Sequence, residues 1–168
     1  MKISNTASTI AYIILGIVLA LGINQGLAFA LSTDMPVVAV ESNSMIPTFY
    51  KGDMLILQGI PTEQLEIGDI IVFSPPGRTP IVHRIIEINP DGTFQTKGDA
   101  NTNQLVFETS IRPEQIHGKE IMIIPYLGWV KIGLVEFIVP NIIWIVIIVG
   151  AGYGILLGYR KFATPSMV

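Results

Sequence analysis

Two long uncharged stretches, residues 10–31 and 138–159, constrain this 168-residue chain more than any other feature. Each runs for 22 residues without a charged side chain. At a rise of about 1.5 Å per residue, a helix of that length extends about 33 Å, which matches the roughly 30 Å hydrocarbon core of a bilayer. The sequence therefore predicts a transmembrane helix near each end of the chain, with the lipid bilayer as a partner.

The first stretch has a second interpretation. Lys2, the apolar run and Ala28-Phe29-Ala30 are also typical of a secretory signal peptide with a small-residue cleavage site. The apolar core of such a peptide spans only about 7 to 15 residues, so the length of this stretch favours a retained anchor. Both interpretations place the segment that follows on the far side of the membrane.

The charges outside the two stretches predict how the chain crosses the membrane. Lys2 precedes the first stretch, and Arg160 and Lys161 follow the second. By the positive-inside rule both termini should be cytoplasmic, which makes the chain a multi-pass cell-membrane protein with an extracytoplasmic middle. That middle, residues 32–137, holds 13 Asp and Glu against 7 Lys and Arg. The acidic excess argues against nucleic acid as a partner, because nucleic-acid binding needs basic patches.

The residue types present limit the chemistry. The chain has no cysteine, which excludes disulfides, iron–sulfur clusters, thiolate zinc sites and cysteine nucleophiles. The two histidines, His83 and His117, are too separated in sequence for a metal site without carboxylate help. His117 is expected to face solvent in a turn. The sequence therefore predicts no metal and no cofactor.

The middle of the chain is predicted to be an all-β, mostly antiparallel domain. Runs rich in Val, Ile and Phe alternate with turn signals, as expected for strands; the runs are 37–40, 54–58, 70–73, 81–88, 93–97 and 120–124. Asn89-Pro90-Asp91-Gly92 predicts a hairpin, and residues 101–115 are expected to form an exposed loop. The predicted divisions are an anchor at 1–31, the β domain at 32–137, and a second helix with a short tail at 138–168.

Ser44 is the candidate nucleophile. It lies 13 residues past the first apolar stretch, in Glu41-Ser42-Asn43-Ser44-Met45-Ile46-Pro47, where a hydroxyl could meet a substrate at a membrane surface. The alternative is ordinary turn material, because Ser and Asn side chains bond their own backbone. A serine hydroxyl is a poor nucleophile unless a neighbour takes its proton, so Ser44 needs a base from elsewhere in the β domain.

His83 is the candidate base. It shares its parity with Ile81 and Ile85 in the run 81–88, so its side chain is expected on the apolar face of that strand. A hydrogen-bonded core histidine is the alternative. Asp99, at the end of the neighbouring strand, is the candidate to hold the imidazole in one tautomer, unless its carboxylate only closes an Asx-turn.

Five short motifs occur in order along the chain: Ser44-Met45, Gly68-Asp69-Ile70-Ile71-Val72-Phe73, His83-Arg84, Gly98-Asp99-Ala100-Asn101 and Ile124-Pro125-Tyr126-Leu127-Gly128. With the anchor, and over about residues 35 to 130, they resemble the type I signal peptidase family. Histidine in the base position makes the chain similar to the archaeal and endoplasmic-reticulum branch, whereas the usual bacterial branch pairs serine with lysine.

The resemblance implies an all-β catalytic domain with a transmembrane helix at each end, acting as a serine endopeptidase that removes signal peptides from exported preproteins. It implies Ser44 as nucleophile, His83 as general base and Asp99 as the catalytic acidic residue. The Ser42 hydroxyl would join the Ser44 N–H in an oxyanion hole. No cofactor is implied, and accessory membrane subunits are potential partners beside the signal peptides.

The substrate-binding rim is expected to be apolar and to include Met45 and Ile46. Walls of Val, Ile and Met would leave room only for small side chains at the first and third residues before the cut. An extended substrate places alternate side chains on the same side, so both positions should accept alanine.

One departure from the family pattern concerns the acidic residue. Relatives in this branch usually carry a second aspartate six residues after the first, where this chain has Leu105. Either Asp99 serves alone, or a shift of the loop lets Glu108 contribute. A Ser–Lys dyad is disfavoured, because Lys51 lies in a turn and Lys97 lacks an apolar neighbourhood. A protease for other membrane-proximal precursors and a noncatalytic β scaffold are the alternative functions.

Overall fold

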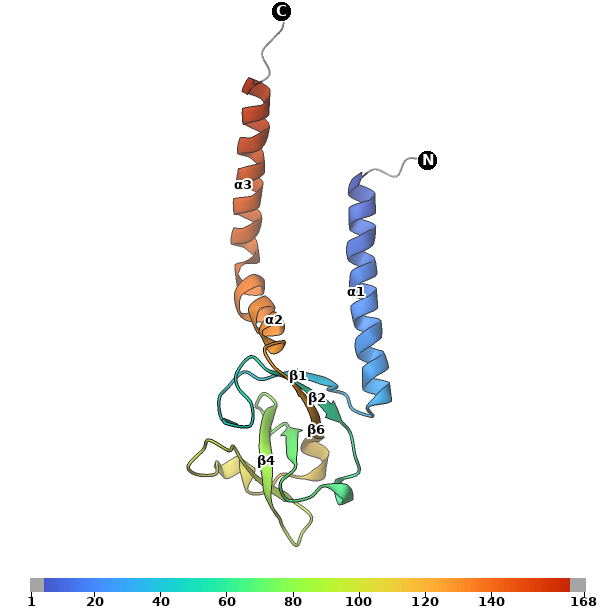
Figure 1. Ribbon diagram of the computed structural model, residues 1–168, viewed down its shortest axis with the longest axis vertical. Helices are drawn as coiled ribbons and strands as arrows, with labels where there is room; N and C mark the ends of the chain where they lie inside the picture. Colours follow the sequence, from blue (N-terminus) through green and yellow to red (C-terminus); the bar gives the residue numbers. More distant parts are fainter. Residues whose placement is uncertain (1–4, 164–168) are drawn as a thin grey trace, which may run out of the picture. The chain divides into compact units, whose positions relative to one another are not determined.

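The computed structural model describes residues 5–163, and the chain divides into two units after Gly128 (Figure 1). The first unit contains helix α1 (Asn5–Ala30) and all the strands. The second contains most of α2 (Gly128–Ile132), a π-helical segment (Gly133–Ile138) and α3 (Val139–Ala163). Lys2, on which the predicted orientation partly depends, lies outside the described residues.

Six strands form one sheet in the order β1-β2-β6-β3-β4-β5, and every neighbouring pair is antiparallel. The strands are β1 (Val37–Ala39), β2 (Met54–Gln58), β3 (Ile70–Phe73), β4 (Ile81–Ile88), β5 (Phe94–Lys97) and β6 (Ile116–Ile124). The expected hairpin joins β4 to β5, where the Asn89 N–H donates to the Thr93 carbonyl at 2.8 Å. The predicted antiparallel β domain is confirmed.

The last strand and the loop before it differ from the sequence-based expectation. Strand β6 begins at Ile116, so His117 lies in a strand, half-buried, and the prediction of a solvent-facing turn is wrong. The loop 101–115 contains two short 3-10 turns, Val106–Glu108 and Pro113–Gln115. It was expected to be exposed, yet Glu108 and Ile111 within it are fully buried.

Apolar side chains pack on both faces of the sheet, which follows from the composition of its central strand. All four residues of β3 are buried, and successive side chains of a strand point to opposite faces. Ile70 and Val72 join one cluster, completed by Val40, Met45, Phe49, Leu55 and Leu57. Ile71 and Phe73 join the other, completed by Leu65, Ile85, Phe94 and Ile111. Strand β4, which carries His83, is thereby held by packing beside β3.

One helix in the described part of the chain is long and apolar enough to cross a membrane by itself. Residues Ala7–Ala30 of α1 qualify, with a mean hydropathy of 2.1. The segments Gly128–Trp144 and Val146–Leu156 meet at a bend of 46° and reach the length of a span only together. One of the two expected spans thus qualifies as a single helix, and the other stays a prediction that requires this bent pair to act as one span.

Candidate active site

Ser44 and His83 come together although 39 residues separate them in sequence. Ser44 lies in the turn that follows β1, and its carbonyl accepts a hydrogen bond from the Ala100 N–H at 2.9 Å. His83 lies on β4, and its Nε2 is 3.0 Å from the Ser44 hydroxyl. His83 is 4% exposed on the same face as Ile85, as its strand parity predicts. A serine hydroxyl within hydrogen-bond reach of an imidazole is the pair that nucleophilic catalysis requires.

The other nitrogen of the imidazole is paired with a buried carboxylate. His83 Nδ1 is hydrogen-bonded to Glu108 Oε1, and the Glu108 side chain is fully buried. An ionised carboxylate can only accept hydrogen bonds, so Nδ1 carries the proton and Nε2 of the neutral ring is left as an acceptor. Nε2 in that tautomer can take the proton of Ser44.

The Glu108 carboxylate accepts two further hydrogen bonds, one from its own loop and one from strand β5. Oε2 accepts the Leu105 N–H at 2.7 Å, and Oε1 accepts the Thr96 hydroxyl at 3.3 Å. The loop is closed at its base by a β-bridge, in which Phe94 and Ile111 exchange two backbone hydrogen bonds of 2.8 Å. Burial of a carboxylate is costly unless it is paired, and these contacts supply the pairing.

Asp99 lies near the serine but is paired with a different side chain. Its carboxylate accepts Arg84 Nε at 2.9 Å and Arg84 Nη2 at 2.6 Å, and it accepts the Thr48 hydroxyl at 2.5 Å. The hydrogen bond from Arg84 lowers the pKa of Asp99, and the same bond raises the pKa of Arg84. Asp99 therefore has no hydrogen bond to the imidazole among these contacts, and Glu108 is bonded to Nδ1 in its place. The catalytic role expected of Asp99 stays a prediction.

The Arg84–Asp99 pair acts as a brace on the turn that holds Ser44. Arg84 Nη2 also reaches the Thr48 hydroxyl at 3.1 Å, and Nη1 donates to the Gly68 carbonyl at 2.8 Å. Bidentate pairing of a guanidinium with a carboxylate fixes geometry as well as charge. The brace therefore ties Thr48, in the turn after Ser44, to the middle of β4 and to the end of β5.

Space beside the serine is limited by one glycine. A Cβ at Gly98 would lie 2.6 Å from the Ser44 carbonyl oxygen and 2.8 Å from His83 Nε2. Only a residue without a side chain fits between the serine and the imidazole. The Ser42 hydroxyl lies on the exposed side, 3.2 Å from the Ser44 hydroxyl.

Comparisons with known proteins identify the family. A family model described as signal peptidase, peptidase S26, matches residues 8–103. The signal peptidase complex catalytic subunit SEC11C of Homo sapiens is 35% identical over 123 residues, which cover 67% of this chain and 64% of the relative. The chain belongs to the signal peptidase family, peptidase S26.

A fungal signal peptidase sequence is similar over more of its own length. The signal peptidase complex catalytic subunit SEC11 of Schizophyllum commune is 33% identical over 141 residues, covering 67% of this chain and 72% of the relative. The chain spans somewhat less than two thirds of the mammalian relatives it matches. Both relatives are described as catalytic subunits, in agreement with the resemblance drawn from the motifs.

One of the two apolar residues that follow Ser44 differs from its expected place at a substrate-binding rim. Met45 is 1% exposed and packs in the core with Phe49, so it cannot form a rim against a substrate. Ile46, the next residue, is half-buried and stays a candidate for substrate contact. In the turn 44–49, Met45 and Phe49 lie four residues apart and both pack into the core, a pattern that the expected apolar rim did not include.

Glu108 is the residue of this site that the sequence analysis underestimates. The sequence admits Glu108 only through a shift of its loop, because that loop lacks periodicity. One signal in the sequence could have been used: the apolar Val106-Phe107 and Ile111 around Glu108 suggest a segment that packs inward. Sequence spacing alone does not show where such a segment returns to the sheet.

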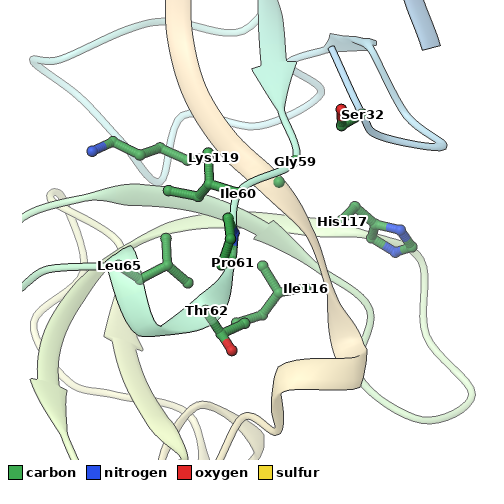
Figure 2. Close-up of a pocket in the computed structure, with 10 residues that line it drawn as sticks. Ser32, Gly59, Ile60, Pro61, Thr62, Leu65, Ile116, His117 and Lys119 are labelled. Carbon is green, nitrogen blue, oxygen red and sulfur yellow. The ribbon is translucent and has the colours of Figure 1, made fainter. Parts of the chain in front are cut away.

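A hollow on the first unit lies outside this site. It has a volume of about 430 Å³ and is lined by Ser32, the segment 59–62, Leu65 and residues 116–119. Figure 2 shows His117 at one end of this group and Lys119 at the other. None of the lining residues belongs to the Ser44 site. Among residues 5–163, no group of three or more His, Asp or Glu side chains could hold a metal ion.

Proposed function

We propose that this chain is a membrane-anchored serine endopeptidase that cleaves N-terminal signal peptides from exported preproteins. The observation that carries the proposal is the continuous array of Ser44, His83 and the buried Glu108. Membership of the signal peptidase family and the described roles of the matched relatives support it. A noncatalytic scaffold has no need of a buried charged group aligned through a histidine to an accessible hydroxyl.

In the proposed reaction, Ser44 Oγ attacks the carbonyl on the N-terminal side of the scissile bond while His83 Nε2 takes its proton. The resulting imidazolium is stabilised by the Glu108 carboxyl group, to which Nδ1 is hydrogen-bonded. His83 then gives the proton to the leaving amine, and a water molecule hydrolyses the acyl-enzyme by the same route. No step requires a metal or an organic cofactor.

The tetrahedral intermediate needs donors for its negative oxygen. We assign the Ser42 hydroxyl and the Ser44 backbone N–H to this role, because the exposed Ser42 hydroxyl lies 3.2 Å from the Ser44 hydroxyl and the N–H belongs to the nucleophile itself. Each such donor contributes a factor of about 10² to 10³ in rate in other serine hydrolases. Asp99 is assigned to positioning, since its partners are Arg84 and Thr48.

The proposed topology has two membrane crossings. Residues 1–31 form the anchor, residues 32–137 form the extracytoplasmic catalytic domain, and residues 138–168 form the second crossing and a short tail. The apolar α1, the bent helical pair after the sheet, and the positive Arg160 and Lys161 support this arrangement. Because the matched relatives are described as subunits of a complex, accessory membrane subunits are proposed partners.

Cleavage of a preprotein by the full-length chain in lipid vesicles tests the function. The wild-type chain should release a signal peptide, and Ser44→Ala should lower the rate by at least about 10³-fold, because the other groups cannot replace the nucleophile. Ser110→Ala, which removes an exposed hydroxyl elsewhere, is the control and should cleave normally. Retention of more than about a few per cent of the rate in Ser44→Ala would remove Ser44 from the mechanism. Absence of cleavage by the wild-type chain would favour the scaffold alternative.

A further inference from the structure

A second serine, histidine and aspartate are hydrogen-bonded in series away from Ser44. His117 Nε2 is 2.7 Å from the Ser74 hydroxyl. His117 Nδ1 is 3.0 and 3.1 Å from the two carboxylate oxygens of Asp34. By the argument used for His83, the carboxylate leaves Nδ1 protonated and Nε2 free to accept the serine proton. The proton-acceptor geometry at Ser74 is therefore at least as close as that at Ser44.

His117 owes its position to an irregularity in the sheet. Along β6, Ile116 pairs with Phe73 and Gly118 pairs with Val72, so His117 is the extra residue of a bulge. Bulges redirect a side chain and are frequent next to active sites. The His117 carbonyl also accepts the buried Thr33 hydroxyl at 2.7 Å, which fixes the backbone next to Asp34.

The three groups are accessible to a small reagent. The His117 and Asp34 side chains are 21% and 69% exposed. Ser74 is half-buried at the end of β3. The hollow of about 430 Å³ includes His117 and Ile116 in its lining, so it gives a small reagent access to the imidazole (Figure 2).

We propose that Ser74 is a second, independently activated nucleophile that is acylated by small activated esters. In the reaction, a bond forms between Ser74 Oγ and the acyl carbon while the bond from that carbon to the leaving oxygen breaks. The leaving group departs with the electron pair, and the serine proton passes to His117 Nε2 and then to water. Water later hydrolyses the acyl-serine by the reverse proton route.

The surroundings of Ser74 define the substrate class. Its own N–H donates to the Gln115 carbonyl at 2.8 Å, and the next two residues, Pro75 and Pro76, have no N–H. The adjacent backbone therefore offers no donor to an oxyanion, and each missing donor costs a factor of about 10² to 10³. Ser74 should react with electrophiles that carry a good leaving group and leave peptide bonds intact.

The test uses the full-length chain in detergent with Ser44→Ala, so that the first site is silent. The probes are p-nitrophenyl acetate and a small alkyl fluorophosphonate, and the labelled residue is located by peptide mass spectrometry. We expect the adduct on Ser74, with no label at the exposed Ser110, whose hydroxyl lies beside Thr93. In this background Ser74→Ala should abolish the adduct. In the chain that keeps Ser44, Ser74→Ala should leave preprotein cleavage unchanged.

Two further variants test the assignment of roles. His117→Gln should slow labelling about a hundredfold or more, because general-base catalysis contributes about 10² to 10⁴. Asp34→Asn should slow it only about two- to fivefold, since an exposed charge pair is weak. Thermal unfolding of each variant, and preprotein cleavage in the Ser44 background, report whether the fold is intact.

The outcomes separate this proposal from the proposed peptidase function. Labelling that is equal at Ser74 and Ser110, or unchanged in a folded His117→Gln variant, overturns the proposal while preprotein cleavage stands. If His117→Gln does not fold, two other results decide. Slower labelling in Asp34→Asn with no label at Ser110 supports the proposal, whereas unchanged labelling in Asp34→Asn or equal labelling at Ser110 overturns it. Failure to cleave preproteins with normal Ser74 labelling would contradict only the peptidase function.

Discussion

His83 and Glu108 form a side-chain pair in the protein interior, with 5% and 0% of their side-chain surfaces exposed. The pair lies between a strand of the sheet and a loop that returns to it 25 residues later. Because Nδ1 is committed to the carboxylate, only Nε2 can exchange a proton with Ser44. The group that pairs with Nδ1 therefore decides whether His83 Nε2 is free to accept the proton of Ser44.

Glu108→Gln should abolish most of the proposed peptidase activity. If the amide nitrogen of Gln faces the Leu105 N–H, two hydrogen-bond donors face each other and the Leu105 N–H loses its acceptor. If it faces His83, Nδ1 must accept and Nε2 becomes protonated, so the base is lost. We expect cleavage of a preprotein to fall by about 10² to 10⁴-fold, as for tautomer-disrupting changes in other serine proteases. Glu114→Gln, an exposed control, should cleave normally, and equal rates for the two variants would contradict the assignment.

Asp99→Asn should affect stability more than catalysis. The substitution removes the charge that pairs with Arg84, and hydrogen bonds to charged groups contribute about 1.5 to 3 kcal/mol. We expect the free energy of unfolding to fall by about 1 to 3 kcal/mol, and cleavage to fall by less than about tenfold because Asp99 does not bond His83. A loss of cleavage as large as that of Glu108→Gln would return Asp99 to the catalytic role implied by the family resemblance.

The stabilisation from Asp99 should also depend on pH. Its pKa is held below the ordinary value of 3.8, chiefly by the hydrogen bond from Arg84. A carboxylate with a depressed folded-state pKa stabilises the fold above its unfolded pKa, and that contribution is lost as the pH falls through the folded value. The difference in unfolding free energy between wild type and Asp99→Asn should be full above about pH 5 and shrink below about pH 4. Urea unfolding across this range measures it, and a difference that stays constant would refute the prediction.

Gly98→Ala should separate the serine from its base. The added Cβ would meet the Ser44 carbonyl oxygen at 2.6 Å and His83 Nε2 at 2.8 Å, so one of the two must move. A displacement of about 1 Å at a reacting group can cost about a hundredfold in rate, and we expect a loss of that order in preprotein cleavage. Gly133→Ala is the matched control, because nothing lies within 4 Å of its added Cβ. Normal cleavage by Gly98→Ala would mean that the Ser44–His83 contact is not needed.

Met45→Ala should destabilise the domain without changing its specificity. Met45 is buried with Phe49 in one core cluster, and truncation of a buried methionine costs about 2 to 5 kcal/mol. Cleavage of preproteins with Ala or Phe at the third residue before the cut should keep the same preference for Ala. Ile46→Ala is the comparison, since that side chain is half-buried and can contact substrate. Ready acceptance of Phe by a stable Met45→Ala variant would restore Met45 to the substrate rim.

The sequence predicted the parts of the site that follow from local patterns. Strand parity placed His83 on the buried face, turn signals placed the β4–β5 hairpin, and the motif order placed Ser44 in a turn. Pairing of Glu108 with His83 could not be predicted, because it depends on where a non-periodic loop returns to the sheet. Burial of Met45 was missed for a related reason: the turn coils inward, and an apolar residue beside a nucleophile is compatible with either a rim or a core.

The bridge between Phe94 and Ile111 allows the acidic residue to occupy different positions in the loop without changing the rest of the site. Its two backbone hydrogen bonds hold the two ends of the intervening loop together. The sheet fixes only the position of His83 Nδ1, beside which a carboxylate must lie. The path of the loop decides which of its residues occupies that position. Leu105 can then stand where the family resemblance implies a second aspartate, while Glu108 supplies the charge beside His83. The proposed base, His83, lies on a strand of the sheet, whereas the proposed acid, Glu108, lies in a loop in which the position of the acidic residue can change. A comparison of sequences position by position would therefore report the acid as lost.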